Sequence, residues 1–394
     1  MRKQVAYVHC KTIGVELQSG IQKKEQGRRP RRIAGAGAHR MKGNVLGKGI
    51  DMKSCRIGIL GATGAVGQEM RKILEEYRLP VTELRLLASA RSAGARLPFA
   101  GRELPVRETT EDAFAGLDYV LGAVEAEQSR FWAPAIRRSG AVYIDNSSAF
   151  RLEPGVPLVV PEINGADAFA HSGIIANPNC STVISLMAAA PIHRLSPIES
   201  MTVSTYQAVS GAGQAGQWEL EEQLRAVAAG EEPVHKVFPA QIALNVIPFI
   251  GAETENGYTD EEMKLQNEGR RILHQPQLRV SCTCVRVPVL RSHSISLCLR
   301  TREPVSPEAA RAAIRAFPGL RLAEDLDGRD YPTPLDCADG DTVWVGRLRR
   351  DLCDERGLTL WCCGDQLRKG AAANAVQILR LMAESEQRTV NSEQ

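Results

Sequence analysis

The stretch that most constrains the fold joins an apolar run to a helical pattern through a glycine-rich turn. Ile57–Leu60 is apolar, residues 61–67 read Gly-Ala-Thr-Gly-Ala-Val-Gly, and residues 68–77 have helical spacing. Glycines let the backbone approach a pyrophosphate, and a helix N-terminus favours its charge. Glycine turns are common, but a position directly after the first strand favours a Rossmann-type dinucleotide site. The residues predicted to bind the cofactor here are Gly61, Thr63, Gly64, Ala65, Val66 and Gly67.

A second predicted strand, Leu84 to Ala88, ends in a loop without an acidic residue. In a Rossmann-type unit, an acid after this strand binds the ribose 2′-hydroxyl of NAD, whereas Arg and Ser accommodate the 2′-phosphate of NADP. The loop here contains Ser89, Arg91 and Ser92. These residues favour NADP, although a solvated loop with one arginine is the competing interpretation.

Further strands are predicted at 118–123 and 141–144, with a helix around 129–139 between them. Strands that alternate with helices indicate an α/β fold with a parallel, doubly wound sheet. The polar loop 145–151 follows a strand end, which is the edge where such sheets bind ligands. Arg151 can hold an anion there with its planar fork of donors.

The residues around Cys180 predict a strand, a tight turn and a helix. The apolar run 174–176 precedes Asn-Pro-Asn-Cys-Ser-Thr, and residues 183–190 are good helical material. Unpaired N–H groups and the helix dipole stabilise a thiolate in the first turn of a helix. Ser181 and Thr182 are small, so we expect the sulfur to be reachable. Cys180 is therefore the candidate nucleophile, and a buried cysteine that merely packs is the alternative.

Two polar side chains stand at predicted strand ends in the second half of the chain. The strands 279–287 and 294–301 place Arg286 at an end and His293 in the intervening turn. The ordinary pKa of histidine suits a general base, but a surface or satisfied histidine is an equally weighted alternative. An earlier alternating strand, 200–206, delivers Gln207.

A helix is predicted from Thr259 to Leu273, because Thr259 and Glu262 have the spacing of a capping box. Glu261 and Lys264 are three residues apart and would lie on one face of it. A last helix is expected to end near Ala383, followed by a frayed polar tail.

The bulk composition is that of an ordinary globular protein. The chain has 394 residues, of which 43% are hydrophobic and 24% charged, which allows two domains with substantial cores. A net charge of +3 and the lack of a basic stripe argue against nucleic acid as a partner. The ten cysteines are scattered without the spacing of a metal site, which favours a cytoplasmic location. No apolar run reaches the length of a membrane helix, about 20 residues.

Residues 1–52 differ from the remainder. They are rich in Arg, Lys and Gly, contain few acids and show no periodicity, so we expect a disordered leader. Met52 stands directly before the first strand. We therefore interpret Met52 as the true start of the protein.

Several motifs occur together in one order, and they cover residues 53–383. They are Gly-Ala-Thr-Gly-Ala-Val-Gly67, Asp145-Asn-Ser-Ser-Ala-Phe-Arg151, Asn177-Pro-Asn-Cys-Ser-Thr182, Tyr206-Gln-Ala-Val-Ser-Gly211, Cys284-Val-Arg-Val-Pro-Val289 and Leu367-Arg-Lys-Gly-Ala371. Together they resemble the aspartate-semialdehyde dehydrogenases of the bacterial type.

The resemblance implies reductive dephosphorylation of L-4-aspartyl phosphate by NADPH, a step toward lysine, diaminopimelate, methionine and threonine. It implies Cys180 as nucleophile, Gln207 as the residue that orients the thioester and His293 as acid/base. The implied substrate-binding residues are Arg286 and Glu261 for the carboxylate and ammonium, Arg151 and Lys264 for phosphate, and Asn179 beside the nucleophile.

The resemblance also implies an NADP-binding Rossmann-type domain (53–179), an α+β catalytic and dimerisation domain (180–366) and a C-terminal helix (367–394) that returns to the first domain. The expected assembly is a homodimer, with a tetramer as the other arrangement found in the family.

This chain departs from the family pattern at two places. Residues 124–128 read Val-Glu-Ala-Glu-Gln, where many relatives have a serine- and glycine-rich turn that contacts the cofactor. Two acids beside the phosphates of a dinucleotide would weaken binding unless they point away. Gln366 stands where relatives commonly have Asn near the nicotinamide, and we expect it to contact the cofactor.

Two other functions stay open from sequence alone. N-acetyl-glutamyl phosphate reductases also use a cysteine on a Rossmann-based scaffold, but their cysteine turn resembles Asn-Pro-Gly-Cys, whereas Asn179 stands here. An acetylated amine also needs no partner such as Glu261. A non-catalytic NADP-binding paralogue is the second alternative, and the altered turn at 124–128 is the feature that favours it.

Overall fold

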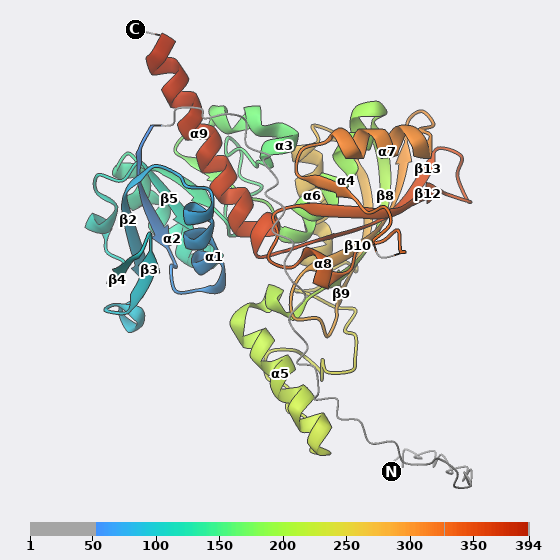
Figure 1. The fold of residues 1–394 in the computed structure, drawn as a ribbon, viewed down its shortest axis with the longest axis horizontal. Coiled ribbons are helices and arrows are strands. Elements are labelled where there is room, and N and C mark those ends of the chain that lie inside the picture. The colour runs from blue at the N-terminus through green and yellow to red at the C-terminus, as the bar shows by residue number, and fades with distance from the viewer. Residues whose placement is uncertain (1–52, 327, 393–394) are drawn as a thin grey trace, which may run out of the picture. The chain divides into compact units, whose positions relative to one another are not determined.

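The computed structural model describes residues 53–326 and 328–392 (Figure 1). The predicted leader and the interpretation of Met52 as the start lie outside the described residues. Within those described ranges, no helix combines the length and the apolar character needed to cross a bilayer.

The first sheet has seven strands in the order β3-β4-β2-β1-β5-β6-β7. The strands are β1 (Cys55–Leu60), β2 (Val81–Ala88), β3 (Arg96–Phe99), β4 (Arg102–Glu108), β5 (Tyr119–Gly122), β6 (Val142–Asp145) and β7 (Ile174–Ala176). Neighbouring strands are parallel except β3 and β4, which pair antiparallel. The predicted parallel sheet is thus confirmed, with one correction at its edge. β3 and β4 both escaped prediction, because β3 is short and has no fully buried residue and β4 has only one.

Helices cover both faces of this sheet. On one face, α1 (Ala65–Glu76) and α9 (Ala373–Ser392) pack against Ile57 of β1. On the other face, α2 (Ala126–Arg138) packs against Leu60 of the same strand. Neighbouring residues of a strand point to opposite faces, so β1 contributes to both cores. The short helical turns of this part are η1 (Ala90–Ser92), η2 (Glu111–Phe114), α3 (Pro161–Asn164) and η3 (Gly165–Ala170).

The C-terminal helix α9 returns to the first sheet, as Figure 1 shows in red against blue and teal strands. It does not end near Ala383, and the predicted fraying from Glu384 is wrong. Arg380 Nε donates to Glu384 Oε1 at 2.6 Å, one helical turn away, and the Tyr119 hydroxyl donates to Glu386 Oε1 at 2.7 Å. The first contact lies within the helix, and the second joins Glu386 to β5.

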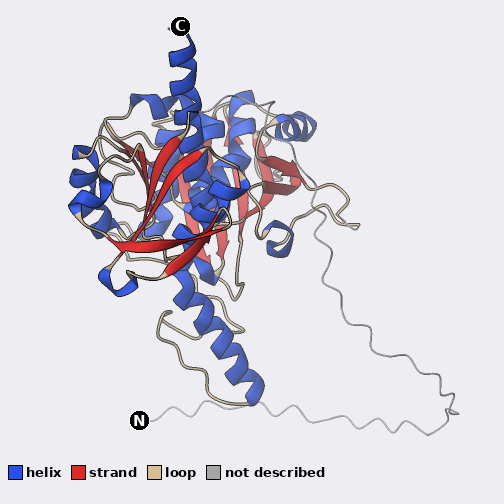
Figure 2. Ribbon diagram, turned by 60° about the vertical axis from the view of Figure 1, so that its left-hand side comes forward, coloured by secondary structure: helices blue, strands red, loops and turns tan. Residues whose placement is uncertain are grey.

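The second sheet is mixed and has six strands in the order β11-β12-β13-β10-β8-β9. Its strands are β8 (Ile198–Gln207), β9 (Arg279–Arg286), β10 (His293–Thr301), β11 (Leu320–Leu322), β12 (Val343–Arg350) and β13 (Gly357–Gly364). The helices of this part are α4 (Cys180–Leu195), α5 (Gly213–Ala229), α6 (Asp260–Ile272), α7 (Pro307–Ala316) and α8 (Pro334–Cys337). Figure 2 shows strands of the molecule, in red, with helices packed beside them. The expected second domain of α+β type is therefore present.

Helix α4 lies at the centre of the second core. Every residue from Ser181 to Ile192 is buried, which is typical of a helix that is enclosed by protein on all sides. It packs with α6, α7 and the apolar face of the second sheet in one cluster. Its first turn also contacts the π-helical turn η5 (Arg368–Ala372), which leads into α9. The fold thus holds the N-terminus of α4 between the last strand of the first sheet and the start of the C-terminal helix.

Candidate active site

Cys180 is the first residue of α4, four residues after β7 ends. The predicted strand, turn and helix are confirmed. Asn179 is the N-cap, and its Oδ1 accepts from the backbone N–H groups of Ser181 (2.9 Å) and Thr182 (3.3 Å). The side chain of Asn179 therefore binds two N–H groups in the first turn of α4, while the Ser181 N–H also lowers the pKa of Cys180.

His293 lies next to the sulfur, with Nε2 3.5 Å from Cys180 Sγ. It is fully buried as the first residue of β10, and its Nδ1 accepts the backbone N–H of Ala208 at 3.0 Å. A backbone N–H can only donate, so the neutral ring carries its proton on Nε2, toward the sulfur. Burial, together with the charge of Arg286, holds the pKa of His293 well below its ordinary value. The ring is neutral near physiological pH.

The thiol of Cys180 is not pre-ionised by its surroundings. Burial raises its pKa to about 11, and the Glu261 carboxylate adds to this rise. The cations Arg151 and Arg286 act in the opposite direction. Burial and the Glu261 carboxylate thus oppose the thiolate that the sequence predicts at the start of α4.

Glu261 accepts hydrogen bonds from three side chains beside Cys180. Its carboxylate accepts from Lys264 Nζ at 2.8 Å, Asn179 Nδ2 at 3.1 Å and Gln207 Nε2 at 3.2 Å. Burial opposes its ionisation, but Lys264 and the two amides outweigh burial and lower the pKa of Glu261. The predicted capping box of Thr259 and the shared helix face of Glu261 and Lys264 are both confirmed. Lys264 lowers the pKa of Glu261 and Glu261 raises that of Lys264, so each group favours the charged form of the other.

The two predicted arginines are buried close to this cluster. Arg286, at the end of β9, donates from Nη1 to Ala208 O at 2.7 Å, and burial lowers its pKa. Arg151 donates from Nε to Asn177 O and from Nη2 to Asn146 O, both at 2.9 Å. Arg151 and Lys264 line one cavity of about 640 Å³.

Glu268 is a site residue that sequence reasoning missed. Its Oε2 accepts the backbone N–H of Asn179 at 2.8 Å, and its Oε1 pairs with Arg151 Nη1 at 3.3 Å. It is buried and stands seven residues after Glu261, two turns along the same face of α6. That spacing could have been noticed in the sequence. The two contacts of Glu268 link Arg151 to Asn179, the N-cap of the helix that begins at Cys180.

Gly370 is a second residue whose place only the structure reveals. A Cβ built on it would lie 2.9 Å from Cys180 Cβ and 3.2 Å from Cys180 Cα. Real Cβ atoms essentially never approach to under 3.0 Å. Glycine is therefore required at this position, because the backbone of η5 lies directly against Cys180.

Most of the predicted cofactor residues line one cavity of about 440 Å³. Gly61, Thr63 and Gly64 line it together with the loop residues Ser89, Arg91 and Ser92. Gly61 has φ of +87°, and a Cβ there would lie 2.3 Å from Ala123 O. Ala65, Val66 and Gly67 form the first turn of α1 behind this lining, and Gly64 provides no side-chain cap. An uncapped helix N-terminus beside a cavity fits the pyrophosphate of a dinucleotide.

The two departures from the family pattern have different outcomes. Glu125 and Glu127 begin α2 and do not line the cofactor cavity, whereas Val124 and Gln128 do. Gln366 is buried, accepts from the Ser292 backbone N–H at 2.8 Å and donates to the Ser210 hydroxyl. Its amide therefore joins the segment before β10 to the turn η4 (Val209–Ala212).

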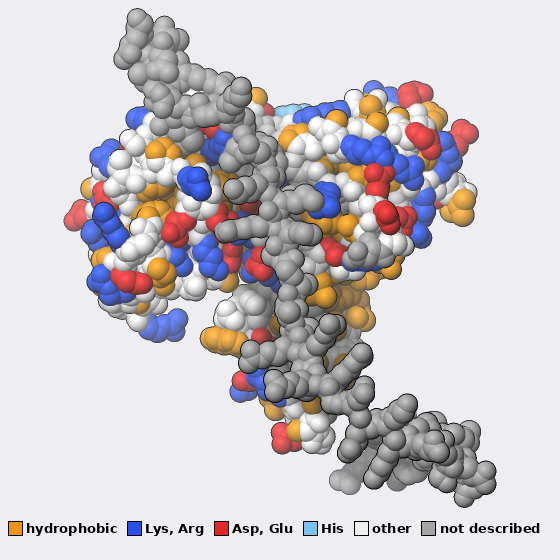
Figure 3. Space-filling model, viewed as in Figure 1, with side chains coloured by type: hydrophobic (Ala, Val, Ile, Leu, Met, Phe, Trp, Pro, Cys, Tyr) orange, Lys and Arg blue, Asp and Glu red, His pale blue; other side chains and the backbone are white. Residues whose placement is uncertain are grey.

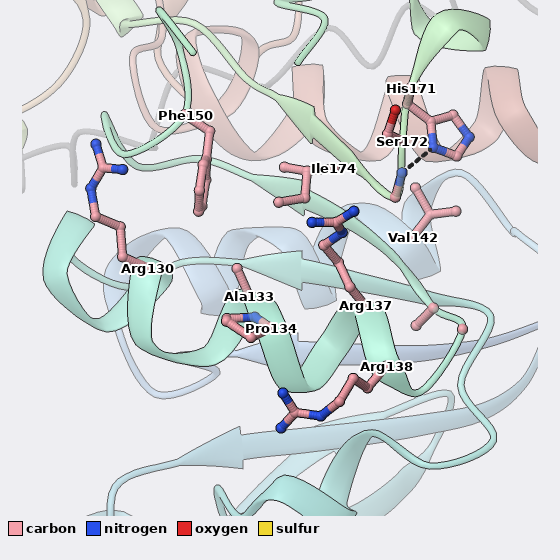
Figure 4. Close-up of a pocket in the computed structure, with 13 residues that line it drawn as sticks. Arg130, Ala133, Pro134, Arg137, Arg138, Val142, Phe150, His171, Ser172 and Ile174 are labelled. Atoms are coloured by element: carbon pink, nitrogen blue, oxygen red, sulfur yellow. Dashed lines mark hydrogen bonds between the residues drawn. The ribbon is translucent and has the colours of Figure 1, made fainter. Parts of the chain in front are cut away.

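Another cavity, of about 630 Å³, lies elsewhere on the first domain (Figure 4). Figure 4 shows Arg130, Arg137 and Arg138 on α2, with Phe150 and Ile174 across the cavity. None of the predicted site residues lines it.

The chain matches two family models. Residues 56–171 match the semialdehyde dehydrogenase NAD binding domain, and residues 189–369 match the semialdehyde dehydrogenase dimerisation domain. The first match assigns a nicotinamide dinucleotide cofactor to the first domain. The second assigns subunit contact to the second domain, which indicates a dimer.

Relatives and solved structures agree with these models. An aspartate-semialdehyde dehydrogenase of Synechocystis is 47% identical over 84% of this chain and 97% of its own length. That of Prochlorococcus marinus is 45% identical over 83% and 95%. The crystal structure of aspartate semialdehyde dehydrogenase II from Vibrio cholerae, complexed with ASA, has a TM-score of 0.82 and 41% identity, and covers 84% of this chain and 98% of that one. The chain therefore belongs to the aspartate-semialdehyde dehydrogenase family.

Proposed function

We propose that this chain catalyses the NADPH-dependent reductive dephosphorylation of L-4-aspartyl phosphate to L-aspartate 4-semialdehyde and phosphate. The observation that carries the proposal is the pair Cys180 Sγ and His293 Nε2, 3.5 Å apart at the start of α4, with the largely buried Glu261 and two buried arginines around it. A thiol, a carboxylate for an ammonium and cations for two anionic groups are the set that this substrate requires.

The proposed reaction proceeds through a thioester on Cys180. The sulfur attacks the acyl carbon of the aspartyl phosphate, the carbon–oxygen bond to phosphate breaks, and the leaving phosphate carries away the proton of the Cys180 thiol. When bound, the nicotinamide cofactor supplies the hydride that reduces the thioester carbon. The carbon–sulfur bond of the resulting hemithioacetal then breaks, which releases the aldehyde, and a proton from solvent restores the Cys180 thiol. The reverse sequence oxidises the aldehyde and requires phosphate to cleave the thioester.

We assign His293 the acid/base position, and its hydrogen bonds support a donor role. The neutral ring has no lone pair on Nε2, because Nδ1 accepts from Ala208. In this tautomer His293 donates a hydrogen bond to the sulfur anion or to an oxygen bound at the reacting carbon. A general-base role requires the ring first to give up its contact with Ala208.

We assign the substrate groups as follows. Arg286 binds the carboxylate, since its Nε and Nη2 have no partner among the described residues while Nη1 is anchored to Ala208. Glu261 binds the ammonium, and Arg151 with Lys264 binds phosphate in the cavity that both line. Gln207 orients the thioester. Its Oε1 accepts from Thr205 Oγ1 at 2.9 Å, which fixes its amide.

NADP is the preferred cofactor in this proposal, with Ser89, Arg91 and Ser92 at the 2′-phosphate and Gln366 near the nicotinamide. We propose domain borders near residues 180 and 367 and a cytoplasmic location.

The assembly is a homodimer, in which the partner covers exposed apolar side chains on and after α5. Figure 3 shows hydrophobic side chains in that region, and the exposed residues are Trp218, Val234, Val237, Leu244, Val246 and Phe249.

The decisive experiment is NADP reduction with L-aspartate 4-semialdehyde, with and without phosphate. Wild type should turn over only with phosphate, and Cys180→Ala should be inactive while still binding NADP. Cys353→Ala is the matched control, because Cys353 is exposed on the loop between β12 and β13. Phosphate-independent turnover, or full activity in Cys180→Ala, would refute the proposal. A folded, cofactor-binding but inactive wild type would favour the N-acetyl-glutamyl phosphate reductase or the non-catalytic paralogue.

A further inference from the structure

The ribose end of the cofactor cavity contains a carboxylate that comes from a different strand than expected. β4 runs parallel to β2, with Glu108 opposite Ala88. Thr109 then donates two hydrogen bonds to Ala88 O, from its backbone N at 2.9 Å and from Oγ1 at 3.0 Å. These bonds fasten the end of β4 to the end of β2, where a Rossmann-type sheet contacts the adenosine ribose.

Glu108 and Arg91 both line the cavity of about 440 Å³ assigned to the cofactor. Both side chains are exposed, and neither has a hydrogen-bond or ion-pair partner among the described residues. One cavity therefore holds an acid and a base that do not neutralise each other. A ligand that reaches this end of the cavity meets both charges.

We propose that Glu108 is a specificity-determining residue that limits the preference of this enzyme for NADP over NAD. The 2′-phosphate of NADP is attracted by Arg91 and repelled by Glu108, whereas the 2′-hydroxyl of NAD can donate to the Glu108 carboxylate. The β3–β4 hairpin thus supplies the acid that the loop after β2 lacks. The inference rests on the proposed cofactor site but not on the chemistry of Cys180.

The test is direct binding of reduced nucleotides to the full chain, followed by nicotinamide fluorescence. Glu108→Gln should lower the Kd for NADPH about two- to fivefold, as expected for removal of one exposed charge, and should leave the Kd for NADH unchanged or higher. The gain for NADPH should shrink as salt is added, because both charges are exposed to solvent. Arg91→Ala should raise the Kd for NADPH and spare that for NADH.

Glu103→Gln is the matched control, because it removes the same charge from the same strand at a residue outside the cavity lining. It should change neither Kd. If Glu108→Gln changed the Kd for NADPH and for NADH equally, the carboxylate would lie near a group that both nucleotides share, and the inference would be overturned. An unchanged Kd for both nucleotides would overturn it as well. A binding readout keeps this test separate from the proposed reaction: an inactive enzyme that shows the expected Kd changes would refute the reaction alone.

Discussion

The backbone N–H of Ala208 donates to Nδ1 of His293 at 3.0 Å, and this bond decides which ring nitrogen faces Cys180. We expect ¹⁵N spectra of histidine-labelled protein at neutral pH to show His293 protonated on Nε2 and unprotonated on Nδ1. The reason is that the tautomer with the proton on Nδ1 would set two N–H groups against each other. A signal for the opposite tautomer would contradict the hydrogen-bond donor role.

Acidification is expected to destabilise the protein through the same residue. Burial and Arg286 hold the pKa of His293 well below its ordinary value, whereas the unfolded chain titrates near the ordinary value of about 6.5. The unfolded state therefore binds a proton first as the pH falls, and stability that is present above about pH 6.5 is lost below it. Thermal unfolding at neutral and mildly acidic pH should show a smaller loss of Tm in His293→Gln than in wild type. Equal losses would show that His293 is not the titrating group.

Alkylation of Cys180 should be slow at neutral pH in the absence of ligands. Burial and Glu261 raise the thiol pKa to about 11, so the thiolate fraction climbs with pH across the alkaline range. Glu261→Gln removes a charge that disfavours the thiolate and should speed alkylation about threefold at a given pH, equivalent to roughly half a pKa unit. Mass spectrometry of the modified peptides measures this, with exposed Cys353 as the internal reference. Rapid alkylation of Cys180 near neutral pH would contradict the raised pKa.

Lys264→Met should lower the free energy of unfolding by about 1–3 kcal/mol, because it leaves the charge of Glu261 largely buried without its cation. The cost is smaller than for a fully buried pair, because Lys264 is partly exposed to solvent. The side chains of Lys264 and Glu261 are 26% and 10% exposed, and their charged atoms are 2.8 Å apart. The lowered pKa of Glu261 contributes stability that is present above its unfolded pKa and lost as the pH falls through the folded one. This acid-side loss should therefore be smaller in the variant.

Urea unfolding at neutral and acidic pH measures both effects. Lys72→Met is the control, since Lys72 forms the same i, i+3 contact with Glu69 at 2.9 Å but is 49% exposed. We expect it to cost less than about 1 kcal/mol. If both variants lost the same free energy of unfolding, the pair of Lys264 and Glu261 would contribute no more than an exposed surface pair.

Gly370→Ala should impair the enzyme through steric contact alone. The new Cβ would lie 2.9 Å from Cys180 Cβ, and displacing packed atoms in this way typically costs about 1–3 kcal/mol. We expect a lower Tm and a reduced kcat, with the Kd for NADPH unchanged because Gly370 does not line the cofactor cavity. An unchanged kcat would show that η5 can move away from Cys180 freely.

Features with a local sequence signal were predictable. The capping box at Thr259, the shared face of Glu261 and Lys264, and the strand, turn and helix around Cys180 all depend on residues within a few positions of one another. The charge state of Cys180, in contrast, depends on the residues that surround it in three dimensions. The dipole of its helix is a local property, but the burial that raises its pKa is not.

The sequence by itself therefore determined three things: the parallel, Rossmann-type first sheet, the helix or strand on which each reactive side chain lies, and the family. These follow from the hydrophobic periodicity, the glycine turns and the order of the motifs, which are all local features of the chain. Only the tertiary structure decided how those groups act. Glu268 reaches Asn179 across 89 residues and Ala208 reaches His293 across 85. Glu108 comes beside the ribose loop through pairing of β2 with β4. Proton position, charge balance and burial depend on such long-range contacts, because they are properties of the space around a side chain and not of its neighbours in sequence.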